Sequence, residues 1–376
     1  MRQNIAIIGA TGNVGRKLIA QVARDDVPEL GIHRNPTVVV ALADSKHLAI
    51  NPGGFPREFL ERFSQTRLEV GTLGAAIAHG EEGVQSLLGR MGSLGFGKDL
   101  IYVDTTAATD VATQLHVKII EETQSGIVTA NKNPVARSSY DEYRRLTNDQ
   151  RRYRYSATAM AGLGAVPWLA ERHIIQDKID EMNASLSGTL GFITDALSRG
   201  IPLSEAIKDA RSKNYTEPDY RDDLNGVDVA RKLVILAREA GYEVNFEDIE
   251  IDPFLPKEYL EMPDPEECLK RIRLELDEKM SDRYRVASER GTTLKYLAHF
   301  GLENGKPVLK VGLQKVEAGS AFGSLKGTSN RIEVITGMYT KEKPYRLEGP
   351  GAGTDITASV VRRDLVNMQP HVNRFS

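Results

Sequence analysis

The stretch Asn4-Ile5-Ala6-Ile7-Ile8-Gly9-Ala10-Thr11-Gly12-Asn13-Val14-Gly15 decides the fold of the first part of the chain. It is an apolar strand that runs into a glycine-rich turn, and residues 16–22 continue from the turn as a helix. Gly9 and Gly12 allow the backbone to turn tightly and approach a pyrophosphate, and Gly15 allows the helix to pack closely on the strand. The helix N-terminus adds free N–H donors and the positive end of a dipole. A strand, a glycine turn and a helix in this order predict a dinucleotide-binding domain.

The turn and the strands after it supply the residues expected at the dinucleotide. The turn has the spacing G-x-x-G-x-x-G, which is one residue longer than the usual pattern. The residues of the turn that we expect at the dinucleotide are Gly9, Gly12, Asn13 and Val14. Two further apolar strands, residues 100–103 and 126–128, end in polar side chains. Ligands sit outside the carboxyl ends of the strands in an open parallel sheet. We therefore expect four polar residues at the nicotinamide end of the cofactor: Thr105, Thr106, Asn131 and Lys132.

The choice between NAD and NADP depends on residues that follow a strand at 37–42. Asp44 would bind the ribose 2′-hydroxyl, as in many NAD-binding domains. Lys46, with Ser45 beside it, would instead hold the 2′-phosphate of NADP. The two signals conflict, so both cofactors stay open, and the cation and hydroxyl together favour NADP. Residues 25–36 read as an inserted loop between this strand and the glycine turn.

A second informative stretch, residues 217–232, places many charges around the start of a helix. It reads EPDYRDDLNGVDVARK, and from Val227 onward its apolar residues have helical spacing. Asp228 and Lys232 are four residues apart, so they lie on one face of that helix. An acid and an amine on one rigid surface, preceded by an acid-rich loop that contains Glu217, suit a small polar substrate. The alternative is a solvated helix with an ordinary ion pair.

The rest of the second half has the pattern of a mostly antiparallel sheet. Residues 293–300 and 307–316 alternate in polarity around Glu303-Asn304-Gly305-Lys306, which predicts a hairpin. Residues 182–186 and 331–336 read as further strands.

Two small-residue segments of the second half are candidates for ligand contact. Ser187-Gly188-Thr189-Leu190 follows a strand, and we expect Thr189 at the substrate, with simple turn chemistry as the alternative. Residues 348–358 read as a second glycine-rich turn that enters a helix. We expect this segment to return to the nucleotide domain and to place Gly349 at the cofactor, with a plain helix-start loop as the alternative.

The composition excludes several classes of protein. The chain has 376 residues, 40% of them hydrophobic, which is enough for two or three domains with sizeable cores. A net charge of −3 leaves no basic footprint for nucleic acid, and no stretch reaches the ~20 apolar residues of a membrane span. The single cysteine, Cys268, fits a reducing compartment. A strand that begins almost at once leaves no room for a signal peptide, so we expect a cytoplasmic protein.

Along nearly its whole length the sequence resembles the homoserine dehydrogenase family. Six matching segments follow the glycine turn: residues 103–106, 128–132, 187–189, 217–232, 325–330 and 349–358. The stretch 217–232 is the most specific of them, because little else combines E-P-D, R-D-D and D-x-A-R-K at this spacing.

The resemblance implies an NAD(P)-dependent oxidoreductase that interconverts L-aspartate 4-semialdehyde and L-homoserine, in the biosynthesis of threonine, methionine and isoleucine. It implies that Lys232 donates and accepts the proton and that Glu217 and Asp228 hold the amino acid. It places Lys132 beside the nicotinamide and the substrate, and it implies a homodimer.

Two departures from the family's pattern bear on ligands. Ser156 or one of its neighbours stands where the family has a glutamate that helps to bind a monovalent cation, which leaves the metal site unknown and the cation doubtful. Asn214 stands where a glycine near the cofactor is usual. Asparagine is the non-glycine residue best able to adopt a positive φ, so the turn can survive.

Two other functions remain open at this point. Aspartate-semialdehyde dehydrogenase has a turn similar to Gly9-Ala10-Thr11-Gly12, but its chemistry needs a thiolate. The only thiol, Cys268, lies in a charged segment with no histidine near it in sequence. A non-catalytic NAD(P)-binding protein would not need the acids and the lysine of residues 217–232.

These patterns predict an α/β chain of two domains. Residues 1–150, completed by residues 341–376, are expected to form a Rossmann-type dinucleotide-binding domain. Residues 151–340 are expected to form an α+β substrate-binding and dimerisation domain with a mostly antiparallel sheet.

Overall fold

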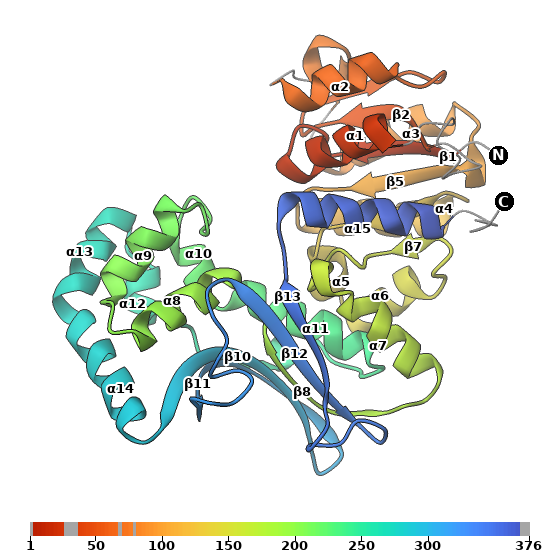
Figure 1. Ribbon diagram of the computed structural model, residues 1–376. Helices are drawn as coiled ribbons and strands as arrows, with labels where there is room; N and C mark the ends of the chain where they lie inside the picture. Colours follow the sequence, from red (N-terminus) through yellow and green to blue (C-terminus); the bar gives the residue numbers. More distant parts are fainter. Residues whose placement is uncertain (1–2, 26–36, 67–69, 78–79, 369–376) are drawn as a thin grey trace. The chain divides into compact units, whose positions relative to one another are not determined.

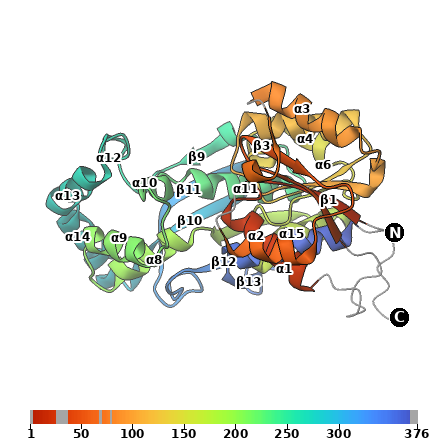
Figure 2. The same cartoon turned by 90° about the horizontal axis from the view of Figure 1, so that it is seen from above.

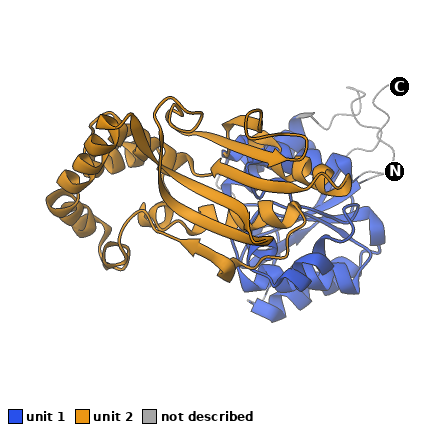
Figure 3. Ribbon diagram, turned by 90° about the horizontal axis from the view of Figure 1, so that it is seen from below, with its two compact units in different colours: residues 1–161, 353–376 blue, residues 162–352 orange. Residues whose placement is uncertain are grey.

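The computed structural model describes residues 3–25, 37–66, 70–77 and 80–368. The chain divides into two units, one of residues 1–161 with 353–376 and one of residues 162–352 (Figure 3). The sequence pattern placed these boundaries at 150 and 340. The inserted loop expected at residues 25–36 lies outside the described residues, apart from Asp25 at the end of a helix.

A seven-stranded sheet forms the centre of the first unit, in the order β4-β3-β2-β1-β5-β6-β7. Five strands run parallel, and β3 and β4 are antiparallel at one edge. The strands are β1 (Gln3–Ile8), β2 (Thr37–Ala43), β3 (His47–Ile50), β4 (Ala75–Ala76), β5 (Leu100–Asp104), β6 (Gly126–Thr129) and β7 (Tyr153–Arg154).

Helices cover both faces of this sheet, α1, α2 and α15 on one and α3, α4 and α6 on the other (Figure 2). Strands covered on both faces need nearly continuous apolar runs, and β5, for example, is buried at all its positions. Val361 and Leu365 of α15 enter the same core as Ile5 and Ile7, so this late helix belongs to the first unit. The helices are α1 (Asn13–Asp25), α2 (Arg57–Gln65), α3 (Gly80–Gly92), α4 (Asp110–Glu122), α5 (Asn133–Ala136), α6 (Tyr140–Thr147) and α15 (Thr354–Asn367).

The carboxyl ends of three central strands are aligned. Strand β1 has β2 on one side and β5 on the other, so the strand order reverses at β1. Ile8 pairs with Asp104, and Asp104 pairs with Thr129. The polar segments that follow these strands therefore meet at one edge of the sheet, at the switch point where open parallel sheets bind ligands.

The second unit contains a six-stranded sheet in the order β13-β12-β8-β10-β11-β9. Only the β9–β11 pair is parallel, which confirms the mostly antiparallel sheet. Asn304 and Gly305 join β10 to β11 with φ of 52° and 77°, as a two-residue hairpin turn requires. The strands are β8 (Ile179–Ser185), β9 (Ile249–Ile251), β10 (Thr292–Glu303), β11 (Lys306–Glu317), β12 (Ser329–Thr336) and β13 (Tyr345–Pro350).

Helix α11 packs against β9, β10 and β11, and α8, α9, α13 and α14 pack with one another (Figure 1). Gly226 precedes α11 with a φ of 78°, so the chain enters the helix through a left-handed residue. The helices are α7 (Ala165–Ile174), α8 (Gly188–Ser198), α9 (Leu203–Ser212), α10 (Arg221–Leu224), α11 (Val227–Glu239), α12 (Lys257–Leu260), α13 (Pro265–Glu275) and α14 (Asp277–Glu289).

The segment around Gly349 differs from the sequence-based expectation. Gly349 lies in strand β13, where it pairs with Asn330 of β12, and is not part of a turn. Residues 351–353 make the connection to α15. Glycine content suggested a turn, whereas antiparallel pairing with the preceding strand β12 extends residues 345–350.

Candidate active site

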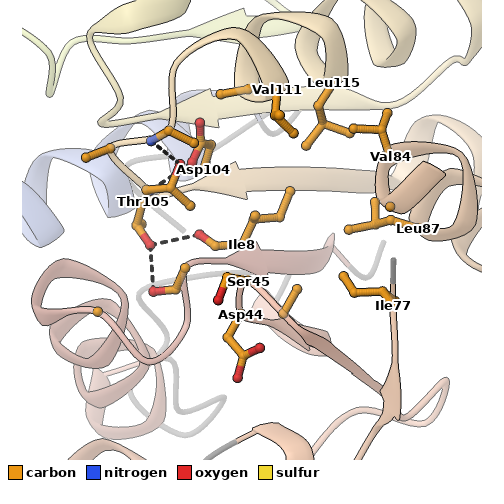
Figure 4. A pocket seen from close by; sticks show the side chains of 18 of the residues that line it. Ile8, Asp44, Ser45, Ile77, Val84, Leu87, Asp104, Thr105, Val111 and Leu115 are labelled. Atoms are coloured by element: carbon orange, nitrogen blue, oxygen red, sulfur yellow. Dashed lines mark hydrogen bonds between the residues drawn. The ribbon is translucent and has the colours of Figure 1, made fainter. Parts of the chain in front are cut away.

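A cavity of about 540 Å³ opens at the carboxyl edge of the parallel sheet (Figure 4). Its volume lies within the usual range of small-molecule pockets. The glycine turn, the end of β2 and the segment after β5 contribute the polar part of its lining. The apolar part comes from Ile77, Val84, Leu87, Val111 and Leu115.

The glycine turn is held tightly against the end of β2. The N–H groups of Gly9 and Ala10 both donate to Ala43 O at 3.0 Å, and Gly9 has a φ of 83°. A Cβ at position 15 would lie 2.3 Å from Gly9 O, so α1 can approach the turn only with glycine there. Gly9 and Gly12 line the cavity, whereas the Val14 side chain packs on the core. These residues fit a dinucleotide.

Both threonines predicted at the nicotinamide end line the cavity. The Thr105 hydroxyl donates to Ile8 O at 2.9 Å and to Gly9 O at 3.2 Å (Figure 4). The Thr106 hydroxyl accepts from Asn131 Nδ2 at 3.2 Å. These hydrogen bonds hold the segment after β5, residues 105–109, which we call the threonine loop, against the glycine turn.

Lys132 lies half-buried at the start of α5, between two buried asparagines. Asn131 Nδ2 donates to Ala108 O at 2.8 Å, and Asn133 Nδ2 donates to the same carbonyl at 3.1 Å. The segment that carries Lys132 is therefore fixed to the threonine loop. Lys132 is not part of the lining of the cavity.

A second cavity, of about 550 Å³, shares Asp44 with the first. Asp44 Oδ1 accepts the backbone N–H groups of Lys46 and His47, both at 2.8 Å, so this carboxylate oxygen shapes its own turn. Lys46, Asn13, His47 and Arg16 also line this cavity. The sequence-based interpretation missed Arg16, although a cation in the first turn of the helix after a glycine turn was a visible signal.

In the second unit, Lys232 is the centre of a polar cluster. It is 9% exposed. Its Nζ lies 2.8 Å from Asp228 Oδ2 and donates to Leu186 O at 2.7 Å. The predicted pair on one face of α11 is thus formed, and a backbone carbonyl from the end of β8 fixes the amine.

Asp223 joins the predicted residues Thr189 and Glu217. Its Oδ1 accepts from the Thr189 hydroxyl at 3.0 Å, and its Oδ2 accepts from the Glu217 backbone N–H at 2.8 Å. Burial raises the pKa of the Asp223 carboxyl to about 6, and the charges of Glu217 and Asp228 add to this rise. The Thr189 hydroxyl and the Glu217 backbone thus meet at a residue that the sequence-based interpretation left unassigned, although Asp223 is part of the R-D-D signature.

Two further predictions concern single residues. Asn214 adopts a φ of 56°, which confirms the left-handed turn expected of it. Cys268 is fully buried in α13, and its thiol donates to Tyr259 O at 3.3 Å. A nucleophilic thiol must be accessible to its substrate, so Cys268 does not suit thioester chemistry.

The segment of the doubtful cation site is held by a carboxylate from α15. The Ser156 N–H donates to Asp364 Oδ2 at 2.9 Å, and burial raises the pKa of the Asp364 carboxyl. Across the described ranges there is no group of three or more histidine, cysteine, aspartate or glutamate side chains placed to hold a metal ion. Likewise, no described helix has the length and apolar content to cross a bilayer.

One unit has a glycine turn at the switch point of a parallel sheet, and the other has a buried lysine among acids. Both features are typical of the class of dinucleotide-dependent oxidoreductases. The family model described as homoserine dehydrogenase matches residues 166–366, just over half of the chain. The chain belongs to the homoserine dehydrogenase family.

Individual relatives agree with this assignment. The bifunctional aspartokinase/homoserine dehydrogenase of Haemophilus influenzae is 34% identical over 274 residues, which cover 72% of this chain and 33% of that protein. The chloroplastic bifunctional enzyme of Daucus carota is 30% identical over 373 residues, covering 96% of this chain and 38% of that protein. The chain spans roughly a third of the length of these relatives, 33% of one and 38% of the other. A hyperthermophilic archaeal homoserine dehydrogenase, solved with NADPH, superposes with a TM-score of 0.72 at 21% identity, covering 99% of this chain and all of that one.

Proposed function

We propose that this chain interconverts L-aspartate 4-semialdehyde and L-homoserine with a nicotinamide dinucleotide. The observation that carries the proposal is the amine of Lys232, held between the Asp228 carboxylate and Leu186 O. A nicotinamide dinucleotide held at the glycine turn would supply or accept the hydride. The carbonyl oxygen then needs a proton, and a cationic amine at that oxygen both stabilises the developing charge and donates the proton. In the reverse direction, the amine recovers that proton from the hydroxyl.

The acids around Lys232 are suited to the rest of the substrate. Homoserine carries an ammonium group, and carboxylates are its natural partners. We assign Glu217, Asp223 and Asp228 to this group. Asp228 also orients Lys232 one helical turn away, and Thr189 keeps the Asp223 carboxylate in place. Lys132 is assigned to the nicotinamide end of the first unit.

We further propose NADP as the preferred dinucleotide. The cavity beside Asp44 contains the cationic side chains of Arg16 and Lys46, which suit a 2′-phosphate. Asp44 is engaged in its own turn through Oδ1. NADPH in the related archaeal structure supports the same choice.

Steady-state turnover tests the proposal against its rivals. The purified chain should oxidise homoserine with NADP and reduce the semialdehyde with NADPH. Phosphate-dependent oxidation of the semialdehyde would identify an aspartate-semialdehyde dehydrogenase instead. Dinucleotide binding without turnover of either substrate would identify a non-catalytic binding protein.

A further inference from the structure

Three buried polar side chains form a row next to the lining of the dinucleotide cavity. Asp104 ends β5, His116 lies on α4, and Tyr153 lies on β7, with exposures of 2%, 1% and 0%. His116 Nε2 lies 3.2 Å from Asp104 Oδ2, an ion-pair contact without the alignment of a hydrogen bond. His116 Nδ1 lies 2.7 Å from Tyr153 Oη, within hydrogen-bond distance. The proposed reaction uses none of the three.

Asp104 belongs both to this row of side chains and to the lining of the cavity. Its Oδ1 accepts the Thr106 backbone N–H at 2.8 Å, and its Oδ2 accepts from Asn131 Nδ2 at 3.1 Å. Burial by itself raises the pKa of a carboxyl, but His116 and Thr106 outweigh it and hold the pKa of Asp104 below its usual value. Asp104 is therefore an anion in the interior, and a buried anion depends on each of its donors.

The donors of Asp104 set the position of the threonine loop. The Thr106 N–H is fixed by the carboxylate, and the Thr105 hydroxyl next to it is bonded to Ile8 O and Gly9 O. The loop and the glycine turn are so close that a Cβ at position 9 would lie 2.9 Å from Thr105 Oγ1. A rotation of the Asp104 carboxylate would thus move the two backbone segments that face the dinucleotide.

We propose that His116 is a positioning residue for the dinucleotide: braced by Tyr153, it holds the Asp104 carboxylate in place and so fixes the threonine loop against the glycine turn. The inference rests on the proposed function, because it assigns the cavity to a dinucleotide. His116 itself does not line the cavity.

A buried network could also stabilise the fold alone, and a matched pair of tyrosines separates the two roles. Tyr153→Phe removes the hydroxyl that contacts His116. Tyr143→Phe removes the hydroxyl of another buried tyrosine of the first unit, 6% exposed against 0% for Tyr153, and this hydroxyl bonds to Tyr155 Oη at 2.8 Å. Both variants lose a buried hydroxyl, but only the hydroxyl of Tyr153 contacts His116.

The test measures the Kd for NADPH by fluorescence titration, with thermal unfolding of each variant alongside. His116→Leu should raise the Kd roughly tenfold and Tyr153→Phe about threefold, whereas His116→Gln, which retains a donor and an acceptor, should stay within about twofold. Tyr143→Phe should lower the Tm as Tyr153→Phe does and leave the Kd unchanged.

Several outcomes would overturn the inference. An unchanged Kd in both His116→Leu and Tyr153→Phe would do so, as would an equal rise in Tyr143→Phe. If His116→Leu does not fold, Tyr153→Phe and His116→Gln decide the question by the same criteria. If the unaltered chain does not bind NADPH, both the proposed function and the inference are contradicted. If the unaltered chain binds NADPH and the variants bind it with the same Kd, only the inference is contradicted.

Discussion

At the scale of single residues, burial changes the chemistry of Asp223 most clearly. Its carboxyl has a pKa of about 6, raised first by desolvation and then by neighbouring acids. An acid with a raised pKa takes up its proton as the pH falls through that value, and a neutral carboxyl binds an ammonium group poorly.

The kcat/KM for homoserine should therefore fall as the pH drops below about 6, by up to tenfold per pH unit, because this ratio reports ionisations of the free enzyme. A pH series at saturating dinucleotide checks this. Asp223→Asn should have a raised KM and lack the step. A ratio that stays flat through this range would remove Asp223 from substrate binding.

Lys46 is the residue at which cofactor choice can be tested. It is exposed and lines the cavity beside Asp44. Lys46→Ala should raise the KM for NADPH roughly fivefold, the equivalent of about 1 kcal/mol for an exposed charged contact, and leave the KM for NADH nearly unchanged. Lys17→Ala is the matched control, because Lys17 is another exposed lysine of the same unit, paired with Asp355 at 3.1 Å. If NADH is already the better substrate of the unaltered chain, Asp44 reads the ribose and the NADP assignment is wrong.

At the scale of elements, α11 depends on how the chain enters it. Gly226 has a φ of 78°, and a Cβ there would lie 2.2 Å from Tyr296 Oη. Tyr296 cannot easily give way, because its hydroxyl donates to Asp252 O at 2.8 Å. Gly200 has a similar φ of 81°, but no atom lies within 4 Å of its added Cβ.

Gly200→Ala should therefore lower the free energy of unfolding by about 1–2 kcal/mol, which is the strain of a left-handed backbone at a residue with a side chain. Gly226→Ala should cost a further ~1–3 kcal/mol of overpacking and displace the helix that carries Asp228 and Lys232. Urea unfolding of both variants measures the difference. Equal losses of unfolding free energy would mean that Tyr296 accommodates the methyl group.

Features fixed by local backbone requirements could be predicted from the sequence, and features that depend on contact with another element could not. The glycine turn and the Asn304-Gly305 hairpin follow from local backbone requirements. The strand around Gly349 depends on pairing with Asn330. The role of Asp223 depends on Thr189, which lies 34 residues earlier in the chain. Sequence spacing places Asp228 beside Lys232, but the second contact of the amine, Leu186 O, comes from another part of the chain.

At the scale of the whole molecule, exposed apolar side chains are concentrated in one unit. Of eight large apolar residues that are exposed in the described parts of the chain, two lie in the first unit and six in the second. The six are Ile174, Ile175, Tyr215, Leu274, Val286 and Met338. They lie on several separate elements, and they are candidates for the interface of the homodimer that the family resemblance implies.

Light scattering on the purified chain should therefore give the mass of two copies. Met338→Glu, at a side chain that is 69% exposed, should shift the mass toward one copy. Leu73→Glu, at an exposed residue of the first unit, should leave it unchanged. If the unaltered chain has the mass of a single copy in solution, the proposed dimer is contradicted.

The most direct measurement compares two lysine variants of the second unit in homoserine oxidation. Lys295 is 5% exposed and donates to a backbone carbonyl, Leu325 O, at 2.9 Å, much as Lys232 donates to Leu186 O. Only Lys232 also pairs with an acid of the proposed substrate site. Lys232→Met should lower kcat roughly 100-fold or more with little change in dinucleotide affinity, whereas Lys295→Met, where folded, should retain turnover of the same order as the unaltered chain. Near-normal turnover in Lys232→Met would contradict the assignment of the proton to this amine.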